Sequence, residues 1–128
     1  VYIEQSTNFK WLRVLSLRGC EIDELPKCIE YFSLVKYLDL SNSKVRRLPS
    51  SICRLCNLQT LDLNYSKIEE LPKEMGELCN LRYLGLKWTW ELKFIAEGMG
   101  KLTNLRTLHS FVGTKRLDQT TGGIVNTR

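Results

Sequence analysis

The residues whose types could do covalent or metal chemistry are five cysteines and a single histidine, His109. Cys53 and Cys56 have the spacing of a redox or metal-binding pair, but zinc usually needs four ligands of compatible spacing, and His109 lies far along the chain. An odd number of cysteines fits unpaired thiols in a reducing compartment better than a secreted disulfide framework. We therefore expect small thiols that are buried or half-buried and no metal ligands. The expected location is the cytoplasm, with the nucleus as the alternative.

The segment "GMGKLT" from Gly98 to Thr103 superficially resembles a phosphate-binding loop. Such a loop places a glycine five residues before its Gly-Lys and a hydroxyl residue directly after the lysine. Ile95 and Leu102 stand in those two places. The remaining acids are scattered and give no nucleophile–base arrangement. The sequence therefore predicts no catalytic residues and no cofactor in this chain, which is not expected to be an enzyme.

The element that organises the chain is a repeat. "LRVLSL" from Leu12, "VKYLDL" from Val35, "LQTLDL" from Leu58 and "LRYLGL" from Leu81 begin 23 residues apart, and "LRTLHS" from Leu105 follows after 24. A fixed period in this range predicts a solenoid in which each unit buries its apolar face against its neighbours. The pattern is a leucine-rich repeat.

Each unit divides into two parts. "LxxLxL" predicts a short strand with alternate leucines inward, and the strands of successive units pair in parallel. Pro26, Pro49 and Pro72 lack an amide hydrogen, which suits the opposite, convex side, where no ladder needs a donor. The predicted fold class is an α/β repeat solenoid: a right-handed leucine-rich-repeat horseshoe fragment with a parallel β-sheet on its concave face and irregular or short helical convex turns.

Three segments are expected: a lead-in over 1–8, repeats over 9–113 (about 4.5 units) and a flexible C-terminal segment over 114–128. We expect an interior piece of a longer protein, because neither end resembles a cap with a polar outer face. The apolar positions of the four units are predicted to form the core: Leu12, Leu15, Leu17, Ile22, Leu25, Ile29, Phe32; Val35, Leu38, Leu40, Val45, Leu48, Ile52, Leu55; Leu58, Leu61, Leu63, Ile68, Leu71, Met75, Leu78; Leu81, Leu84, Leu86, Leu92, Ile95, Met99, Leu102.

Short polar side chains at equivalent positions should satisfy backbone groups at the turns. One column is formed by Cys20, Ser43, Ser66 and Thr89, and another by Asn57, Asn80 and Asn104. On the convex side, the pairs Asp23-Glu24, Arg46-Arg47 and Glu69-Glu70 fall in equivalent places, and Glu21 should face Lys44. These charges predict a salt-bridge ladder between repeats; a docking patch for a neighbouring domain is the alternative.

Specificity must lie in the strand residues that point away from the core. Stacked at roughly 4.8 Å, they form columns with a basic edge, an acidic centre and an aromatic cluster of Tyr37, Tyr65, Tyr83 and Trp88. Aromatic and arginine side chains are favoured anchors at protein interfaces. The predicted protein-binding residues of the concave face are Arg13, Arg18, Lys36, Tyr37, Asp39, Asp62, Tyr65, Arg82, Tyr83, Trp88 and Arg106; a merely solvated face is the alternative.

Other partner classes are not favoured. The net charge of +5 would suit nucleic acid, but acidic residues interrupt the basic column, so no nucleic-acid binding is expected. No apolar run approaches the roughly 18–20 residues of a membrane span, so none is expected.

Units of the form "LxxLxLxx(C/S/T)xIxxLPxxIxxL" resemble the repeats of plant intracellular nucleotide-binding leucine-rich-repeat (NLR) disease resistance proteins. "LRVLSLRGCEIDELPKCI" resembles the start of that domain and "LTNLRTLHSFVG" its following segment, so the likeness covers Phe9 to about Gly113. The fourth unit departs, with Ala96 for proline and "KWTWE" inserted.

The resemblance implies a sensor of pathogen effectors, either directly or through a guarded host protein, in the plant defence response. It also implies an autoinhibitory contact with an intramolecular nucleotide-binding domain. The parent protein would bind ADP or ATP through that upstream domain, which is absent here. The alternative is an intracellular scaffold of the Ras-binding type with no nucleotide-binding module, although such scaffolds favour Asn where this chain has Cys20, Ser43, Ser66 and Thr89. A secreted receptor and an enzyme whose catalytic part lies outside this chain also remain open.

Overall fold

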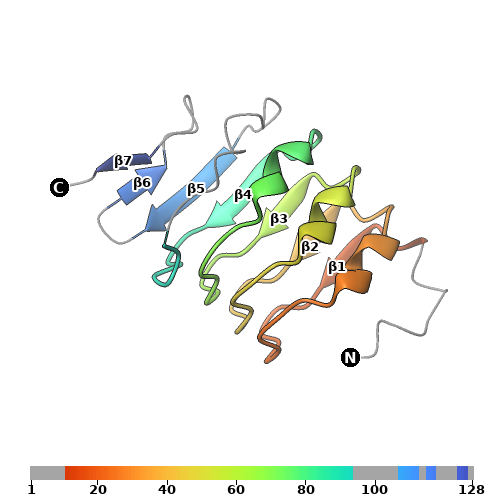
Figure 1. Ribbon diagram of the computed structural model, residues 1–128, viewed down its shortest axis with the longest axis horizontal. Helices are drawn as coiled ribbons and strands as arrows, with labels where there is room; N and C mark the ends of the chain where they lie inside the picture. The colour runs from red at the N-terminus through yellow and green to blue at the C-terminus, as the bar shows by residue number, and fades with distance from the viewer. Residues whose placement is uncertain (1–10, 94–106, 113–114, 118–123, 127–128) are drawn as a thin grey trace.

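In a computed structural model, residues 11–93 are described with their side chains, and residues 107–112, 115–117 and 124–126 as strands. Seven strands form one sheet in chain order (Figure 1). Their bounds are β1 (Val14–Ser16), β2 (Tyr37–Asp39), β3 (Thr60–Asp62), β4 (Tyr83–Leu86), β5 (Thr107–Val112), β6 (Lys115–Leu117) and β7 (Ile124–Asn126).

Strands β1 to β5 are parallel, and their register follows the repeat. Leu15, Leu38, Leu61 and Leu84 are successive partners, and Leu84 pairs with Leu108. The extra residue of the fourth unit is therefore taken up before β5. The solenoid predicted from the period is confirmed.

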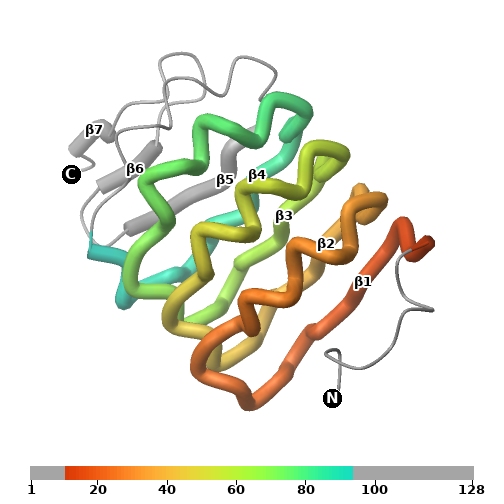
Figure 2. The backbone as a smooth tube through the Cα atoms, turned by 45° about the vertical axis from the view of Figure 1, so that its right-hand side comes forward, coloured from red at the N-terminus to blue at the C-terminus, as the bar shows by residue number. Residues whose placement is uncertain are grey.

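Each repeat unit forms one coil of the solenoid. Within residues 14–93, three short 3-10 helices lie on the side of the coils opposite the sheet (Figure 2). They are η2 (Lys27–Tyr31), η3 (Ser50–Arg54) and η4 (Lys73–Glu77). Each follows a proline whose φ lies between −59° and −68°, and the carbonyl of that proline accepts the first hydrogen bond of the helix. Proline fixes this angle without strain, so the Leu-Pro pairs set where each helix begins.

The core fills the space between the sheet and these helices. Every predicted core position of the second and third units is buried, and Leu38, Leu61 and Ile52 have no exposed surface. Such inward leucines pack against the equivalent leucines of neighbouring coils, so each coil stabilises the next. The predicted positions Ile95, Met99 and Leu102 lie outside the described residues.

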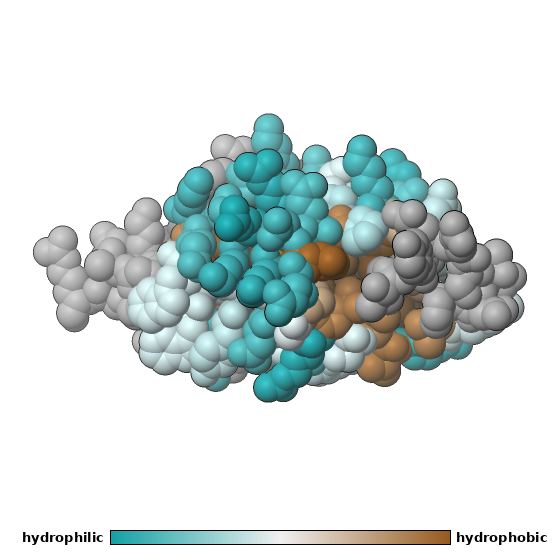
Figure 3. All heavy atoms as spheres, turned by 90° about the horizontal axis from the view of Figure 1, so that it is seen from below, coloured by the Kyte–Doolittle hydropathy of each residue, from teal (hydrophilic) through white to brown (hydrophobic). Residues whose placement is uncertain are grey.

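The first unit differs from the second and third. Ile22, predicted to be core, is 40% exposed, and Leu12 and Leu15 are only half-buried. Apolar side chains gather at this end of the molecule (Figure 3), where Val14 is 61% exposed. Full burial of these side chains depends on a neighbouring coil on both sides, and no described residue supplies one before β1.

Asparagines tie the coils together as predicted. The Asn57 side-chain nitrogen donates to the Ser33 carbonyl at 3.0 Å, and that of Asn80 donates to the Cys56 carbonyl at 2.7 Å. Asn104 lies outside the described residues. Each bond joins one coil to the preceding coil and satisfies a carbonyl that the sheet ladder does not reach.

The second small polar column is confirmed only in part. Thr89 Oγ1 donates to the Leu86 carbonyl at 2.7 Å, and Ser43 Oγ accepts the Val45 amide at 3.4 Å. Ser66 Oγ is buried without a hydrogen-bond partner in the described part of the chain. Small size, rather than a bond at every turn, is what the four positions share.

On the convex side, the repeats are joined by backbone bridges at the positions where a salt-bridge ladder was predicted. Glu24, Arg47 and Glu70 are side by side as predicted, joined by isolated parallel bridges. Within residues 11–93, however, the ion pairs join other side chains: Lys44 to Glu21 at 2.9 Å, as predicted, and Arg54 to Glu30 at 3.4 Å. The adjacent charges are exposed, so water solvates them at little cost and short contacts are not required.

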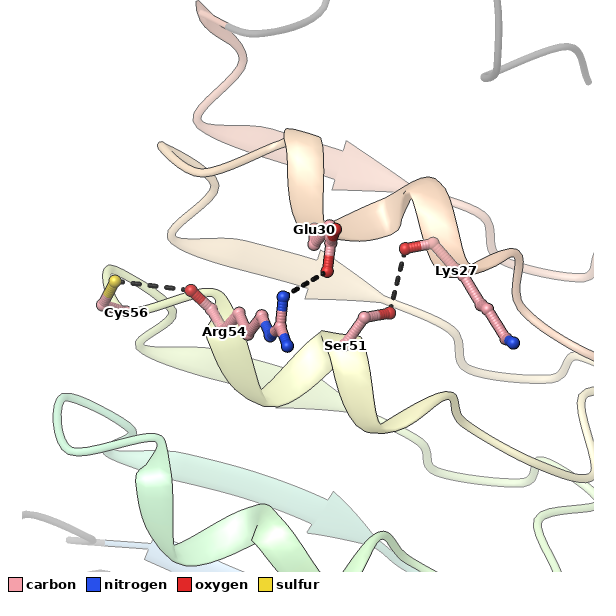
Figure 4. Close-up of polar contacts among 5 residues, drawn as sticks. All are labelled: Lys27, Glu30, Ser51, Arg54 and Cys56. Atoms are coloured by element: carbon pink, nitrogen blue, oxygen red, sulfur yellow. Dashed lines mark hydrogen bonds and ion pairs between the residues drawn. The ribbon is translucent and has the colours of Figure 1, made fainter.

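Neighbouring 3-10 helices are joined by polar contacts (Figure 4). Arg54 of η3 reaches Glu30 of η2, and Ser51 Oγ donates to the Lys27 carbonyl at 2.9 Å. These contacts lie on the side of the coils opposite the sheet.

Strands β6 and β7 lie within 114–128, which was expected to be a flexible segment. They continue the sheet from β5 in antiparallel pairing, with Phe111 opposite Arg116 and Arg116 opposite Val125. An antiparallel strand needs only a short connection, so a segment too short for another full repeat can still pair with an exposed sheet edge.

Candidate protein-binding surface

The exposed side of β1 to β4, opposite the 3-10 helices, together with the residues that directly flank these strands, carries most of the predicted site residues. We call it the sheet face; it is the predicted concave face. Residues on either side of each inward leucine point to it, because successive side chains of a strand alternate. The register stacks Val14, Tyr37, Thr60 and Tyr83 in one column and Ser16, Asp39, Asp62 and Gly85 in the next. The stacking of outward strand residues in columns, predicted from the sequence, is confirmed.

The basic edge lies just before the strands. Arg13, Lys36 and Arg82 are exposed there, and Gln59 is half-buried. Their backbones are neighbours, since the Arg13 carbonyl accepts the Lys36 amide at 2.7 Å and the Gln59 carbonyl accepts the Arg82 amide at 2.8 Å. Arg106, another of the predicted protein-binding residues, lies outside the described residues.

The acidic centre is formed by Asp39 and Asp62, which are direct register partners on β2 and β3. Both are half-buried. Asp39 Oδ1 accepts the amide and the hydroxyl of Ser41 at 2.9 and 2.6 Å, and Asp62 Oδ1 accepts the Asn64 amide at 3.0 Å. These bonds hold each carboxylate beside the turn that follows its strand.

Burial raises the pKa of Asp62, and the negative charge of Asp39 adds to the rise. The Asn64 amide and the positive charge of Arg18 act in the opposite direction without cancelling it. The pKa of Tyr37 is also raised, first by burial and then by Asp39 and Asp62. Arg18 is exposed, so it moderates the negative potential of this centre from the solvent side.

Three exposed aromatic residues at the turns after β3 and β4 form what we call the aromatic shelf: Tyr65, Trp88 and Trp90. They are 54%, 44% and 56% exposed. The rings of Tyr65 and Trp88 stack with centroids 6.5 Å apart and an interplanar angle of 28°, and Trp88 lies 5.4 Å from Trp90. Tyr65 and Trp88 belong to the aromatic cluster predicted from the sequence, whereas Trp90, within the "KWTWE" insertion, is not among the predicted residues.

The other two predicted aromatic residues have a different place. Tyr37 and Tyr83 stand one column before the acidic pair, on β2 and β4. Tyr83 is half-buried, and its hydroxyl accepts a hydrogen bond from Asn64 Nδ2 at 3.3 Å. They therefore flank the acidic centre, whereas Tyr65 and Trp88 belong to the shelf.

Two residues of the aromatic shelf have a left-handed backbone conformation. Tyr65 and Trp88 have φ of 61° and 58°, and the equivalent positions of the first two units hold Gly19 at 72° and Asn42 at 55°. Glycine and asparagine adopt this conformation readily, whereas a bulky aromatic residue does so at a cost of about 1–3 kcal/mol. This turn shape is common to the four coils, and the third and fourth carry large rings on it.

Asn64 and Gly85 are structural residues of the site that are not among the residues predicted from the sequence. Asn64 Oδ1 accepts the Lys87 amide at 2.8 Å, which fastens the turn that carries Trp88. A Cβ at position 85 would lie 2.8 Å from Asn64 Oδ1. A glycine inside a strand often marks such a close approach, and this is the signal that could have identified the pair.

The described residues show no arrangement for other chemistry. Cys53 is buried and Cys56 is exposed, with its Sγ 3.3 Å from the Arg54 carbonyl, and none of the five cysteines forms a disulfide. Burial, followed by Glu74 and Glu77, raises the pKa of the Cys53 thiol to about 12. Within the same residues, no group of three or more potential ligands could hold a metal ion, and no helix is long and apolar enough to cross a membrane.

Several solved structures have a similar fold. A leucine-rich repeat protein of Leptospira interrogans is 27% identical with a TM-score of 0.66, over 78% of this chain and 31% of its own. The plant peptide hormone receptor RGFR1, solved in complex with RGF2, is 28% identical with a TM-score of 0.61, over 79% and 21%. The Arabidopsis thaliana BIR3–SERK2 complex contains a chain that is 30% identical with a TM-score of 0.58, over 68% and 48%.

The chain thus spans less than half the length of each of these proteins. No curated protein sequence matches it. A family model described as leucine-rich repeat region matches residues 2–123. The register of β1 to β5, the buried leucine columns and this match agree: the chain belongs to the leucine-rich repeat family.

Proposed function

We propose that the chain is a protein-recognition module whose sheet face binds a partner protein. The observation that carries this proposal is the aromatic shelf, where three large rings lie against one another, Tyr65 stacked on Trp88 and Trp90 tilted against it, yet stay about half exposed. Exposed aromatic side chains beside arginines are the usual anchors of protein interfaces. Two of the similar structures are themselves complexes, one of a receptor with RGF2 and one of BIR3 with SERK2.

We further propose that the parent protein is a plant NLR and that this chain is its sensing and autoinhibitory arm in defence. The support is the 23-residue unit with its Leu-Pro pair and its Cys, Ser or Thr at the strand-end turn. In this proposal the partners are a pathogen effector or guarded host protein and the receptor's own nucleotide-binding domain. The chain acts in the cytoplasm or nucleus, and ADP or ATP binds to the upstream domain.

The first experiment is to read the coding sequence upstream of Val1. A Gly-Lys-Ser/Thr in a strand–helix context supports the receptor. Further repeats alone would contradict it and favour the scaffold of the Ras-binding type.

The second experiment tests whether the sheet face makes the autoinhibitory contact. If the upstream domain is present, it is expressed separately and its affinity for this chain is measured with Trp88→Asn on the sheet face and Lys73→Ala on the helix side. A loss of affinity confined to Trp88→Asn supports an autoinhibitory contact through the sheet face. An equal loss in both variants, or a loss with Lys73→Ala alone, contradicts it.

A further inference from the structure

The signs of the charges on neighbouring coils are arranged differently on the two sides of the molecule. Opposite the sheet they alternate in sign, as in Glu21–Lys44 and Glu30–Arg54, which form ion pairs. At the centre of the sheet face, Asp39 and Asp62 are direct partners with the same charge. Like charges opposite each other on paired strands are destabilising. The acidic centre is therefore not explained by the stability of the fold.

Neither aspartate of this centre forms an ion pair among the described residues, whose ion pairs join other side chains. The hydrogen bonds described above engage Oδ1 of both carboxylates, which leaves the Oδ2 atoms as acceptors. The raised pKa values of Asp62 and Tyr37 have Arg18 as their only moderating cation. A cation brought by a partner would relieve this unbalanced charge.

A second unfavourable feature lies directly beside the first. Tyr65 follows Asp62 by three residues, and it holds a bulky ring on left-handed backbone, as does Trp88. Asn64 joins the two features, since it donates its amide to Asp62 and accepts the Lys87 amide beside Trp88. Departures from local stability that cluster at one place are a mark of binding sites.

We propose that the sheet face binds a segment of the partner protein that places an arginine side chain over Asp39 and Asp62 and an adjacent apolar side chain on the aromatic shelf. This inference rests on the proposed protein-binding function and specifies the chemistry of the partner. Arginine fits because its planar guanidinium can bind two carboxylates at once. The rings of Tyr37 and Tyr83 flank the site and add cation–π attraction.

The experiment is a selection of random linear peptides displayed on phage against the whole chain. Peptides that combine an arginine with a neighbouring aromatic or aliphatic residue are expected to be enriched. The net charge of +5 sharpens this result, because non-specific attraction would select acidic peptides instead. Enrichment of arginine would therefore reflect a local site rather than the overall field.

One selected peptide is then synthesised, and its Kd is measured against the wild type and two variants of equal charge change. Asp39→Asn/Asp62→Asn is expected to weaken binding about tenfold or more, while the control Asp23→Asn/Glu24→Gln changes it less than about twofold. Asparagine keeps an oxygen for the Asn64 amide, so the variant should fold, which circular dichroism checks. Citrulline in place of the peptide's arginine should cause the same loss with the wild type.

Other outcomes of these two experiments would overturn either the arginine site alone or the binding face together with it. Enriched peptides without arginine, or equal losses in both variants, would overturn the arginine site and leave the protein-binding face standing. The absence of any enriched peptide would count against the binding face itself, and the arginine site would fall with it.

Discussion

At the scale of single residues, Asp62 is an acid whose ionisation the surrounding structure opposes. Its pKa in the folded chain is above the value of about 3.9 expected in the unfolded chain. Between those two pKa values the folded state binds more protons, so the free energy of unfolding falls as pH rises through this window and stays lower above it. Ionised Asp62 thus lowers stability at neutral pH.

Asp62→Asn is therefore expected to raise the melting temperature relative to wild type at pH 7. The difference in melting temperature between the variant and the wild type should shrink towards pH 3, where Asp62 of the wild type is protonated and, like asparagine, carries no charge. Thermal melts at several pH values measure it, with Asp23→Asn on the opposite side as the control. A difference that does not depend on pH would contradict the expected linkage.

The cysteines allow a second prediction at this scale. The thiolate is the reactive form, so the buried Cys53, with its pKa of about 12, should resist iodoacetamide at pH 8 while the exposed Cys56 and Cys79 react. Trypsin cleaves at Arg54 and separates Cys53 from Cys56, so mass spectrometry can follow each one. All three should react in denaturant. Equal rates in the native chain would show that Cys53 is not in the core.

At the scale of the elements, the turn after β3 and the strand β4 form one unit through Asn64 and Gly85. Gly85→Ala would put a Cβ 2.8 Å from Asn64 Oδ1 and displace the side chain that bonds the Lys87 amide. We expect a loss of about 1–3 kcal/mol in the free energy of unfolding, as for other overpacked sites. Denaturant titration measures it.

The matched control for this element is the same substitution in an Asn64→Ala background. The obstructing side chain is absent there, so Gly85→Ala should cost clearly less, and the double-mutant cycle should give a coupling energy. An equal cost in both backgrounds would mean that the glycine is required for another reason, such as its own backbone conformation.

At the scale of the whole molecule, stability depends on stacking each coil on its neighbours. Leu61 is fully buried in the third coil, between leucine partners on both sides. Leu61→Ala is expected to cost about 2–5 kcal/mol. Val14→Ala, on the exposed side of β1, should cost much less because Val14 is 61% exposed. Similar costs would contradict the inward and outward assignment on which the sheet face depends.

The sequence by itself determined the register of the solenoid. The same leucines return every 23 residues, so Leu38, Leu61 and Leu84 must occupy equivalent places, and their neighbours must stack in columns on the other face. The Leu-Pro pairs likewise determined where the 3-10 helices begin, since proline fixes its own φ. Both are local properties of each unit. Because the units repeat, equivalent residues of successive units come into contact although they lie far apart in the sequence.

Only the tertiary structure decided how side chains meet between coils. It divided the predicted aromatic cluster, added Trp90 to the aromatic shelf and placed the Asn64 side chain over Gly85, because ring and amide orientations depend on the neighbouring coil. It also left Ile22 partly exposed and paired β6 and β7 with the edge of the sheet. The spacing of residues predicts which positions are equivalent, whereas the packing around each position determines how exposed it is and what it contacts.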